Sequence, residues 1–186
     1  MLSGHCAIGQ QLLDYLEAGT QLAVDLINTE PAAVRAEQIG TLPAVRAFMH
    51  ARGQRRRLRV KDVARLQLLR SSLRAVFRAH DAGDAAAHIN ALLISFPVRP
   101  KLVVDAARPA IAFEPEGDDF VAWVAVTAAA GLAFFITQHG VERLGTCIAP
   151  DCEDAFYDGT KNKTKRFCSN GCAQAASLRA FRARRR

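Results

Sequence analysis

Hydrophobic residues recur at helical spacing over the first third of the chain. Between Gly9 and about Glu30, leucine, alanine and isoleucine fall three or four positions apart, which predicts one bent helix or two short helices that meet at Gly19. Pro31 ends this element, because proline cannot continue a helix and disfavours helical geometry in the residue before it.

Three more helices are predicted before residue 96. Thr41 is a suitable N-cap for the first, since Pro43 follows in its first turn, and Gly53 stops it. The second covers about residues 60–80 and turns valine, leucine and phenylalanine toward a core. The third runs from Asp84 to about Ser95.

The apolar period changes after residue 100. The runs KLVVD and AIAFEP, separated by AARP, are short and rich in β-branched or apolar residues, which predicts a β-hairpin. A long helix then runs from about Asp118 to His139, with Asp118 or Asp119 as its N-cap. Residues 120–136 barely reach the length of a membrane span and are built largely from alanine, so a buried core helix is favoured and no membrane partner is expected.

Composition separates the chain into two parts. Residues 1–144 are expected to form a mainly helical domain with one small β-hairpin (α+β), and residues 145–186 are polar, cysteine-rich and basic. A length of 186 residues with 50% apolar content suits one sizeable domain with a small appendage. Five cysteines are too few for a disulfide scaffold, and the N-terminal sequence has no secretory signal pattern. A reducing, cytoplasmic setting is therefore predicted.

The net charge of +7 is concentrated at the C-terminus. Residues 161–186 hold nine Lys or Arg and no Asp or Glu, whereas the preceding 160 residues have a net charge of −2. The basicity thus belongs to the tail and not to the main domain.

Four of the five cysteines lie in that tail region, at Cys147, Cys152, Cys168 and Cys172. Two close pairs joined by a short spacer are typical of a structural tetrahedral zinc site, in which each pair lies on one tight turn. A catalytic zinc would leave one position for water, and a cytosolic disulfide is the weaker alternative. The spacing predicts one structural Zn²⁺ per chain.

The residues between and after the cysteines agree with a treble-clef-like four-cysteine finger. Asp158-Gly159 favours a turn, so the spacer is expected to form a small β-hairpin, and Phe156 and Phe167 are expected to cover the metal. Ser169 or Asn170 can cap a following helix, whose N-terminus stabilises thiolate charge at Cys172. So small a module should be unfolded without its metal.

This segment resembles a CGNR zinc finger, in which a Cys pair is followed by F-x-D-x-[ST], basic residues, an aromatic residue, C-S and a last Cys that opens a basic helix. The matching residues here are Cys147, Cys152, Phe156, Asp158, Thr160, Lys165, Arg166, Phe167, Cys168, Ser169 and Cys172. The chain departs from the family at the tetrapeptide that names it, reading CAQA at Cys172–Ala175 where C-G-N-R is typical. The run LAVDLINT, Leu22 to Thr29, also resembles the opening of the companion ABATE domain. The resemblance implies a bacterial, stress-linked transcription regulator.

Basic side chains around the finger suggest contact with nucleic acid. Arg179, Arg182 and Arg186 share one face of the last helix, while Ala175, Leu178 and Phe181 are expected to pack against the hairpin. The predicted phosphate-contacting residues are Lys163, Lys165, Arg166, Arg179, Arg182, Arg184, Arg185 and Arg186. A solvated tail without a partner, and a zinc-stabilised module that binds an acidic protein, are the alternatives.

In the first domain, Asp25, Asn28 and Thr29 lie about one helical turn apart. They either point together into a ligand pocket or cap and end the helix before Pro31; the family resemblance favours a domain that senses a small molecule or forms a homodimer. Arg70, Arg74 and Arg78 share a helix face, which is expected to be solvated, with anion or nucleic-acid binding as the alternative.

No catalytic motif stands out. The chain shows no Gly-rich phosphate loop, Ser elbow, paired-carboxylate signature or HExxH. The prediction is therefore a non-enzymatic, DNA-binding regulator, and a small-molecule enzyme in the first domain is the minor alternative.

Overall fold

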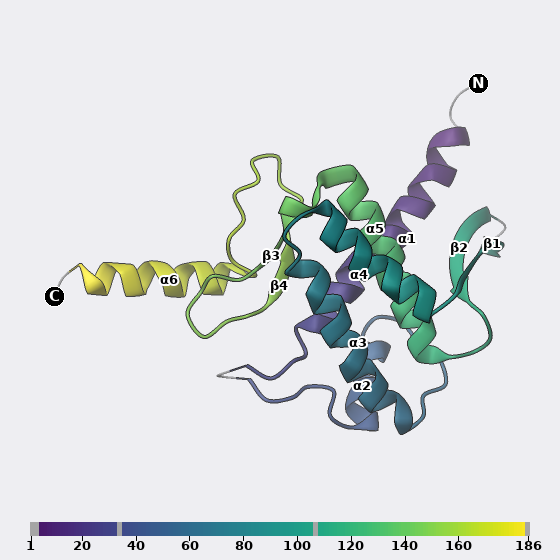
Figure 1. Cartoon of the computed structure of the whole chain (residues 1–186), viewed down its shortest axis with the longest axis horizontal. Coiled ribbons are helices and arrows are strands. Elements are labelled where there is room, and N and C mark those ends of the chain that lie inside the picture. Colours follow the sequence, from purple (N-terminus) through teal and green to yellow (C-terminus); the bar gives the residue numbers. More distant parts are fainter. Residues whose placement is uncertain (1–3, 33–34, 106–107, 185–186) are drawn as a thin grey trace.

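The computed structural model describes residues 4–32, 35–105 and 108–184. Its elements follow one another as α1 (Gly4–Ile27), α2 (Leu42–His50), α3 (Lys61–Phe77), α4 (Ala82–Ser95), β1 (Val98–Asp105), β2 (Arg108–Pro115), α5 (Phe120–His139), the short 3₁₀ helix η1 (Val141–Arg143), β3 (Leu144–Thr146), β4 (Ala155–Tyr157) and α6 (Asn170–Ala183) (Figure 1). We call residues 4–139 the body and residues 144–184 the finger. The fold is mainly helical, as predicted, and contains two small antiparallel strand pairs in the described residues.

Helix α5 is the centre of the body and packs against α1, α3 and α4. Its apolar side chains are buried on all sides, and Leu132 and Val126 are fully inaccessible. Asp119 caps it by accepting a hydrogen bond from the Ala122 N–H at 3.0 Å. By length and composition α5 passes the test for a membrane span, but most of it lies inside the protein, so the predicted core helix is confirmed.

The predicted break at Gly19 is wrong, because α1 is one continuous helix from Gly4 to Ile27. Gly19 instead lies where α1 crosses α5: a Cβ there would overlap the backbone of Thr127, and a Cβ on Gly131 would overlap the backbone of Thr20. The two glycines allow the helix backbones to touch, and the packing gained across this crossing outweighs the helix-weakening effect of glycine.

The other predicted helix starts are mostly confirmed. The Thr41 hydroxyl caps α2 by accepting from the Ala44 N–H. That helix already ends at His50, and Gly53 follows in the turn with φ of 72°. Helix α4 begins two residues earlier than expected, because Asp81 is its N-cap and Asp84 donates its backbone N–H to that side chain at 2.8 Å.

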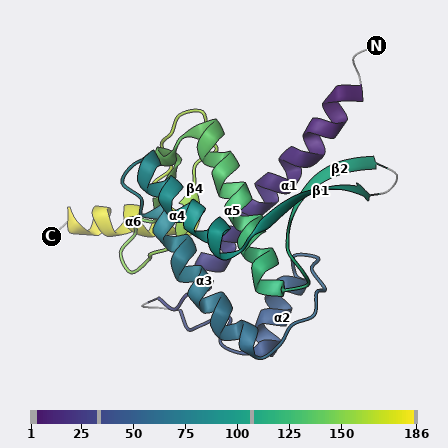
Figure 2. The same cartoon turned by 45° about the vertical axis from the view of Figure 1, so that its right-hand side comes forward.

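The predicted hairpin is present and longer than expected. Strands β1 and β2 pair antiparallel over eight residues each, with Leu102 opposite Ile111. Figures 1 and 2 show it beside α1, where the Tyr15 hydroxyl donates to the Phe113 carbonyl at 3.0 Å. The outer part of the hairpin is solvated, since Leu102 is 74% exposed.

The finger lies at the opposite end of the molecule from the hairpin (Figure 1). Its strands β3 and β4 pair antiparallel, and Leu144 and Ala155 belong to the same apolar core as the body. Helix α6 projects away from the body and has no buried residue. The strand pair therefore joins the finger to the body, while its helix is held out in solvent.

Candidate metal centre and basic helix

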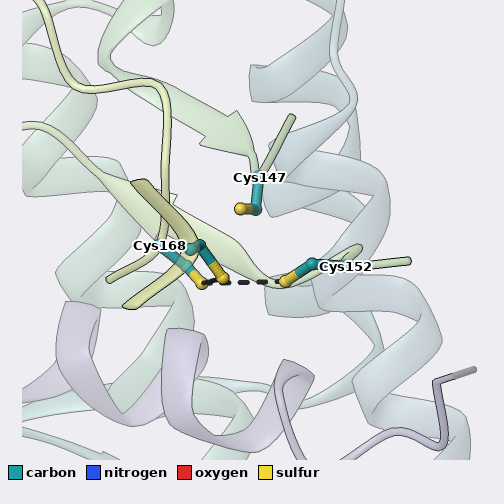
Figure 3. Close-up of side chains that lie close together, drawn as sticks. Cys147, Cys152 and Cys168 are labelled. Carbon is teal, nitrogen blue, oxygen red and sulfur yellow. Dashed lines mark hydrogen bonds between the residues drawn. The ribbon is translucent and has the colours of Figure 1, made fainter. Parts of the chain in front are cut away.

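The four finger cysteines form one cluster. Their sulfur atoms all lie within 4.8 Å of one another, and Figure 3 shows Cys147, Cys152 and Cys168 gathered at the same place. The Cys168 sulfur is 3.7 Å from that of Cys152 and 3.6 Å from that of Cys172. A tetrahedral ion with metal–sulfur bonds of about 2.3 Å would separate its sulfurs by about 3.8 Å, so the spacing fits a metal centre.

Backbone hydrogen bonds bring the two pairs together. Cys147 donates its N–H to the Asp154 carbonyl at 2.8 Å and Cys152 donates to the Ala149 carbonyl at 3.1 Å, which closes the first turn. Asp151 adopts the left-handed region there, with φ of 64°. The segment that carries the second pair is joined to this turn because the Ile148 N–H donates to the Arg166 carbonyl at 3.2 Å.

The second pair lies at the start of α6, as expected. The Ser169 hydroxyl is the N-cap and accepts from the Cys172 N–H at 3.3 Å. The hydrogen bond with this hydroxyl, helped by those with the neighbouring thiols, outweighs the effect of burial and lowers the pKa of Cys172. Burial raises the pKa of Cys152 to about 11. Only a bound cation would make all four sulfurs thiolates at neutral pH.

The predicted hairpin inside the spacer is not formed. Ala155–Tyr157 pairs instead with Leu144–Thr146, which precedes the first cysteine. Phe156 lies opposite Gly145 and covers it, so its ring is 7% exposed and packs within the strand pair. The Asp158-Gly159 signal failed because Asp158 uses its side chain to organise a wider loop.

Asp158 is buried and ties that loop together. Its carboxylate accepts hydrogen bonds from the Thr160 hydroxyl at 2.6 Å, the Thr160 N–H at 2.9 Å and the Lys165 N–H at 2.8 Å. These bonds, the Thr160 hydroxyl first, lower the pKa of Asp158 to about 2. The F-x-D-x-[ST] motif thus shapes the loop that leads from β4 to Cys168.

Two arginines of α3 are buried, and one of them, Arg74, attaches the finger to the body. Arg74 is 7% exposed, donates from Nη1 to the Glu153 carbonyl at 2.7 Å, and forms an ion pair with Glu30 at 2.5 Å. Arg70 is 5% exposed and forms a two-bond ion pair with Glu37 at 2.8 and 2.9 Å. The prediction of a solvated arginine face is therefore wrong for Arg70 and Arg74, because the segment after α1 places Glu30 and Glu37 against them. Of the three arginines on this face, only Arg78 is exposed.

Two further contacts attach the same finger segment. The Asn28 amide donates to the Ala155 carbonyl at 3.0 Å and accepts from the Ala155 N–H at 2.7 Å, like one step of a β-ladder. Arg35 forms an ion pair with Asp154 at 2.7 Å, and this carboxylate raises the pKa of Arg35. Asp154 also lies 3.7 Å from the Cys168 sulfur, so the contact reaches the cysteine cluster.

The Asp25, Asn28 and Thr29 side chains have three different surroundings. Asp25 pairs with Arg52 at 2.7 Å and lines a pocket between α1 and α5. Asn28 contacts β4 as described, and Thr29 is buried, donating to the Leu26 carbonyl and accepting from Arg70. Asp25 alone of the three borders that pocket.

The basic candidates surround the finger on its outer side. Lys163 pairs with Glu142 at 2.9 Å, Lys165 donates to the Tyr157 carbonyl, and Arg166 is exposed. On α6, Arg179 pairs with Asp151 at 3.1 Å, while Arg182 and Arg184 are exposed. Arg185 and Arg186 lie outside the described residues.

The apolar side chains of α6 do not pack on the hairpin as expected. Leu178 is 56% and Phe181 is 50% exposed, because α6 leaves the finger at its first turn and runs outward (Figure 1). The helix thus presents apolar and cationic side chains to solvent together.

Two family models match the chain. Residues 20–139 match ABATE, described as "Putative stress-induced transcription regulator", and residues 143–185 match the CGNR zinc finger. No curated protein matches the chain. The two matched ranges coincide closely with the body and the finger.

Proposed function

We propose that this chain, which belongs to the ABATE family and carries a CGNR zinc finger, is a zinc-containing, DNA-binding transcription regulator of the cytoplasm. Residues 145–186 contact nucleic acid, and residues 1–144 sense a small molecule or form a homodimer. No catalytic step is assigned.

Zinc is the ion that best suits the cysteine cluster. Cys147, Cys152, Cys168 and Cys172 would each supply one thiolate, and four sulfur donors within 4.8 Å of one another are the donor set of closed, structural zinc sites. The finger has little buried surface of its own, so metal binding would supply most of its folding free energy.

The exposed cationic helix is the observation that carries the nucleic-acid proposal. Within residues 161–184 there is no acidic side chain, and among the described residues Arg182 and Arg184 have no acidic partner. A helix held out from the body can approach a duplex without obstruction from the body. Lys163, Lys165 and Arg166 extend the positive surface onto the loop before Cys168.

A salt series on duplex DNA tests this proposal. If four to six side chains neutralise phosphates, the logarithm of the association constant should fall with log salt at a slope of about −4 to −5. Replacing Arg179, Arg182 and Arg184 with glutamine should reduce the magnitude of that slope by about 2 to 3. A matched variant that removes three exposed arginines of the body, at Arg46, Arg55 and Arg57, should leave the slope unchanged. An affinity that does not depend on salt, or an equal reduction of the salt slope in both variants, would contradict the proposal.

The exposed Leu178 and Phe181 favour one alternative, a zinc-stabilised protein-interaction module. Such a module would bind its partner through apolar contacts, so replacing both residues with alanine would abolish binding at any salt concentration. Under the nucleic-acid proposal the same double variant keeps its salt slope.

A further inference from the structure

A pocket of about 280 Å³ opens between α1 and α5, on the body and away from the cysteines. Apolar walls come from Tyr15, Leu22 and Trp123, and the lining is mostly apolar. Its volume is near the lower end of the range for small-molecule pockets, about 300 to 1,000 Å³, so it suits a molecule of about one substituted ring.

The charged side chains at this pocket neutralise each other. Arg52 donates from Nε and Nη2 to one Asp25 oxygen, at 2.9 and 2.7 Å, and from Nη1 to the Phe48 carbonyl at 2.7 Å. The other Asp25 oxygen accepts from the Gln21 amide at 2.7 Å. Neither charge is left to pair with a ligand, so a charged ligand would lose its hydration without compensation. The pocket therefore suits a neutral molecule.

One buried hydroxyl supplies the polar contact. Thr127 is 5% exposed and lines the pocket, and in the described part of the chain its hydroxyl has one side-chain partner, the Tyr15 hydroxyl at 3.5 Å. That distance is at the long limit for an O–H···O bond, whose usual length is about 2.7 Å. A ligand hydroxyl could bond this group better than the present partner does.

The wall of the pocket also contacts the finger. Gln21, which lines the pocket and holds Asp25, accepts a hydrogen bond from the Tyr157 hydroxyl of β4 at 3.0 Å. About two helical turns further along the chain, just after the end of α1, Asn28 bonds Ala155 of the same strand. A ligand that moves Gln21 would thus act directly on the strand that precedes the second cysteine pair.

We infer that this pocket binds a neutral, single-ring aromatic molecule bearing a hydroxyl group, with the ring against Trp123 and the hydroxyl on Thr127, and that occupancy is transmitted to the finger through Gln21 and Tyr157. The inference rests on the sensing role in the proposed function and gives that role a site. Its tests use no nucleic acid, so failure of DNA binding would not be confused with failure of this site.

Binding is tested with para-fluorophenol as the probe and para-fluorobenzoate as the charged control, on the zinc-loaded full chain. Fluorine NMR of the probe and the fluorescence of Trp123, the sole tryptophan, report binding. The expected result is saturable binding with a Kd of about 1 mM or tighter, and binding of the benzoate at least about tenfold weaker. No saturation of the phenol, or equal affinity for the benzoate, overturns the assignment.

Two variants locate the binding. Ala18→Phe fills the pocket from an exposed helical position and should abolish binding, whereas Ala86→Phe, at an exposed position of α4, should not. Thr127→Val should weaken the phenol about tenfold, the loss expected for one hydrogen bond. Circular dichroism and thermal unfolding check that each variant is folded. Persistent binding in folded Ala18→Phe places the probe elsewhere and overturns the site.

The transmission is tested by hydrogen exchange of the Ala155–Tyr157 amides with and without para-fluorophenol. The wild-type chain should show a change in exchange rate of about fivefold or more at β4 on saturation, which corresponds to a coupling of about 1 kcal/mol. Tyr157→Phe keeps the ring beside Phe135 but removes the bond to Gln21, so it should still bind the probe and lose the change at β4. An unchanged wild-type rate, or an undiminished effect in Tyr157→Phe, contradicts the route.

Discussion

The body and the finger are ordered by different means. In the body, α5 is surrounded by other elements and its side chains are buried along most of its length. In the finger, none of the residues of α6 is buried. A 14-residue helix is marginal in water by itself. Apolar burial therefore accounts for the body, whereas the finger depends on its cysteine cluster, its capped first turn and the contacts of β4.

The difference also explains where the chain's charge lies. The body buries two of its arginines, Arg70 and Arg74, against glutamates and balances its other basic residues with acidic ones. The finger leaves its arginines on a helix that needs no burial to persist once the first turn is fixed. A metal-dependent module can thus present more cationic surface than a burial-dependent one of the same size.

The largest expected effect comes from removing one thiol. Cys168→Ser should lower bound zinc from one per chain to much less and melt α6, because the metal-binding free energy that folds such modules is about 10 kcal/mol or more. Metal analysis and far-UV circular dichroism measure the two effects. Cys6→Ser, at the one cysteine outside the cluster, is the control and should change neither. Full α6 helicity in Cys168→Ser would refute the metal requirement.

A pair of glycine substitutions contrasts the two regions directly. Gly131→Ala should destabilise the body by about 3 kcal/mol or more, because the new Cβ meets the backbone of α1 at the helix crossing. Gly171→Ala makes the same chemical change in α6, where the nearest atom is 3.7 Å away. Alanine favours helix there by about 0.5–1 kcal/mol. Chemical denaturation of both variants measures the changes, and similar losses in both would show that the finger is as tightly packed as the body.

Arg74 joins the two regions, so its loss should affect both. Arg74→Met keeps the length of the side chain but leaves the Glu153 and Ile27 carbonyls without their donor and Glu30 without its partner. A loss of about 2–3 kcal/mol is expected, with faster amide exchange at β4. The exposed Arg78→Met is the control and should cost less than about 0.5 kcal/mol. A folded Arg74→Met chain with unchanged β4 exchange would mean that the finger is not held by this arginine.

The smallest predicted effect is a pH-dependent contribution in the body. Arg70, which hydrogen-bonds Glu37, lowers the pKa of that carboxyl. Because the folded pKa is depressed, the stabilisation is complete above the ordinary glutamate pKa of about 4.3 and is lost as the pH falls through the lowered value. Glu37→Gln should therefore lower the free energy of unfolding by about 1 kcal/mol at pH 7. The difference in that free energy between the variant and wild type should shrink below about pH 4. Thermal unfolding across pH measures this, with the exposed Glu17→Gln as control; a difference that grows on acidification would contradict it.

Features carried by neighbouring residues could be predicted from the sequence. The cysteine cluster, the Ser169 cap and the buried α5 each depend on signals within a short stretch of sequence. The structure places the four sulfurs close together, caps α6 with Ser169 and buries α5. The CAQA tetrapeptide keeps Cys172 in the cluster even though the family's other residues are replaced.

Features that depend on distant partners could not be predicted. The burial of Arg74 requires Glu30, 44 positions earlier, and Glu153, 79 positions later. Gly19 looks like a helix break until Gly131 is placed against it. The two glutamates after α1, Glu30 and Glu37, were the available signal for the buried arginines, because a buried guanidinium requires a carboxylate.

Residue-resolved amide exchange, recorded before and after a strong chelator removes the metal, tests the central contrast most directly. Apolar burial in the body and metal dependence in the finger predict that α6 and the loop around Asp158 lose nearly all protection while the α3 and α5 amides keep theirs. Protection of α6 that survives chelation, or loss of protection throughout α5, would contradict the account.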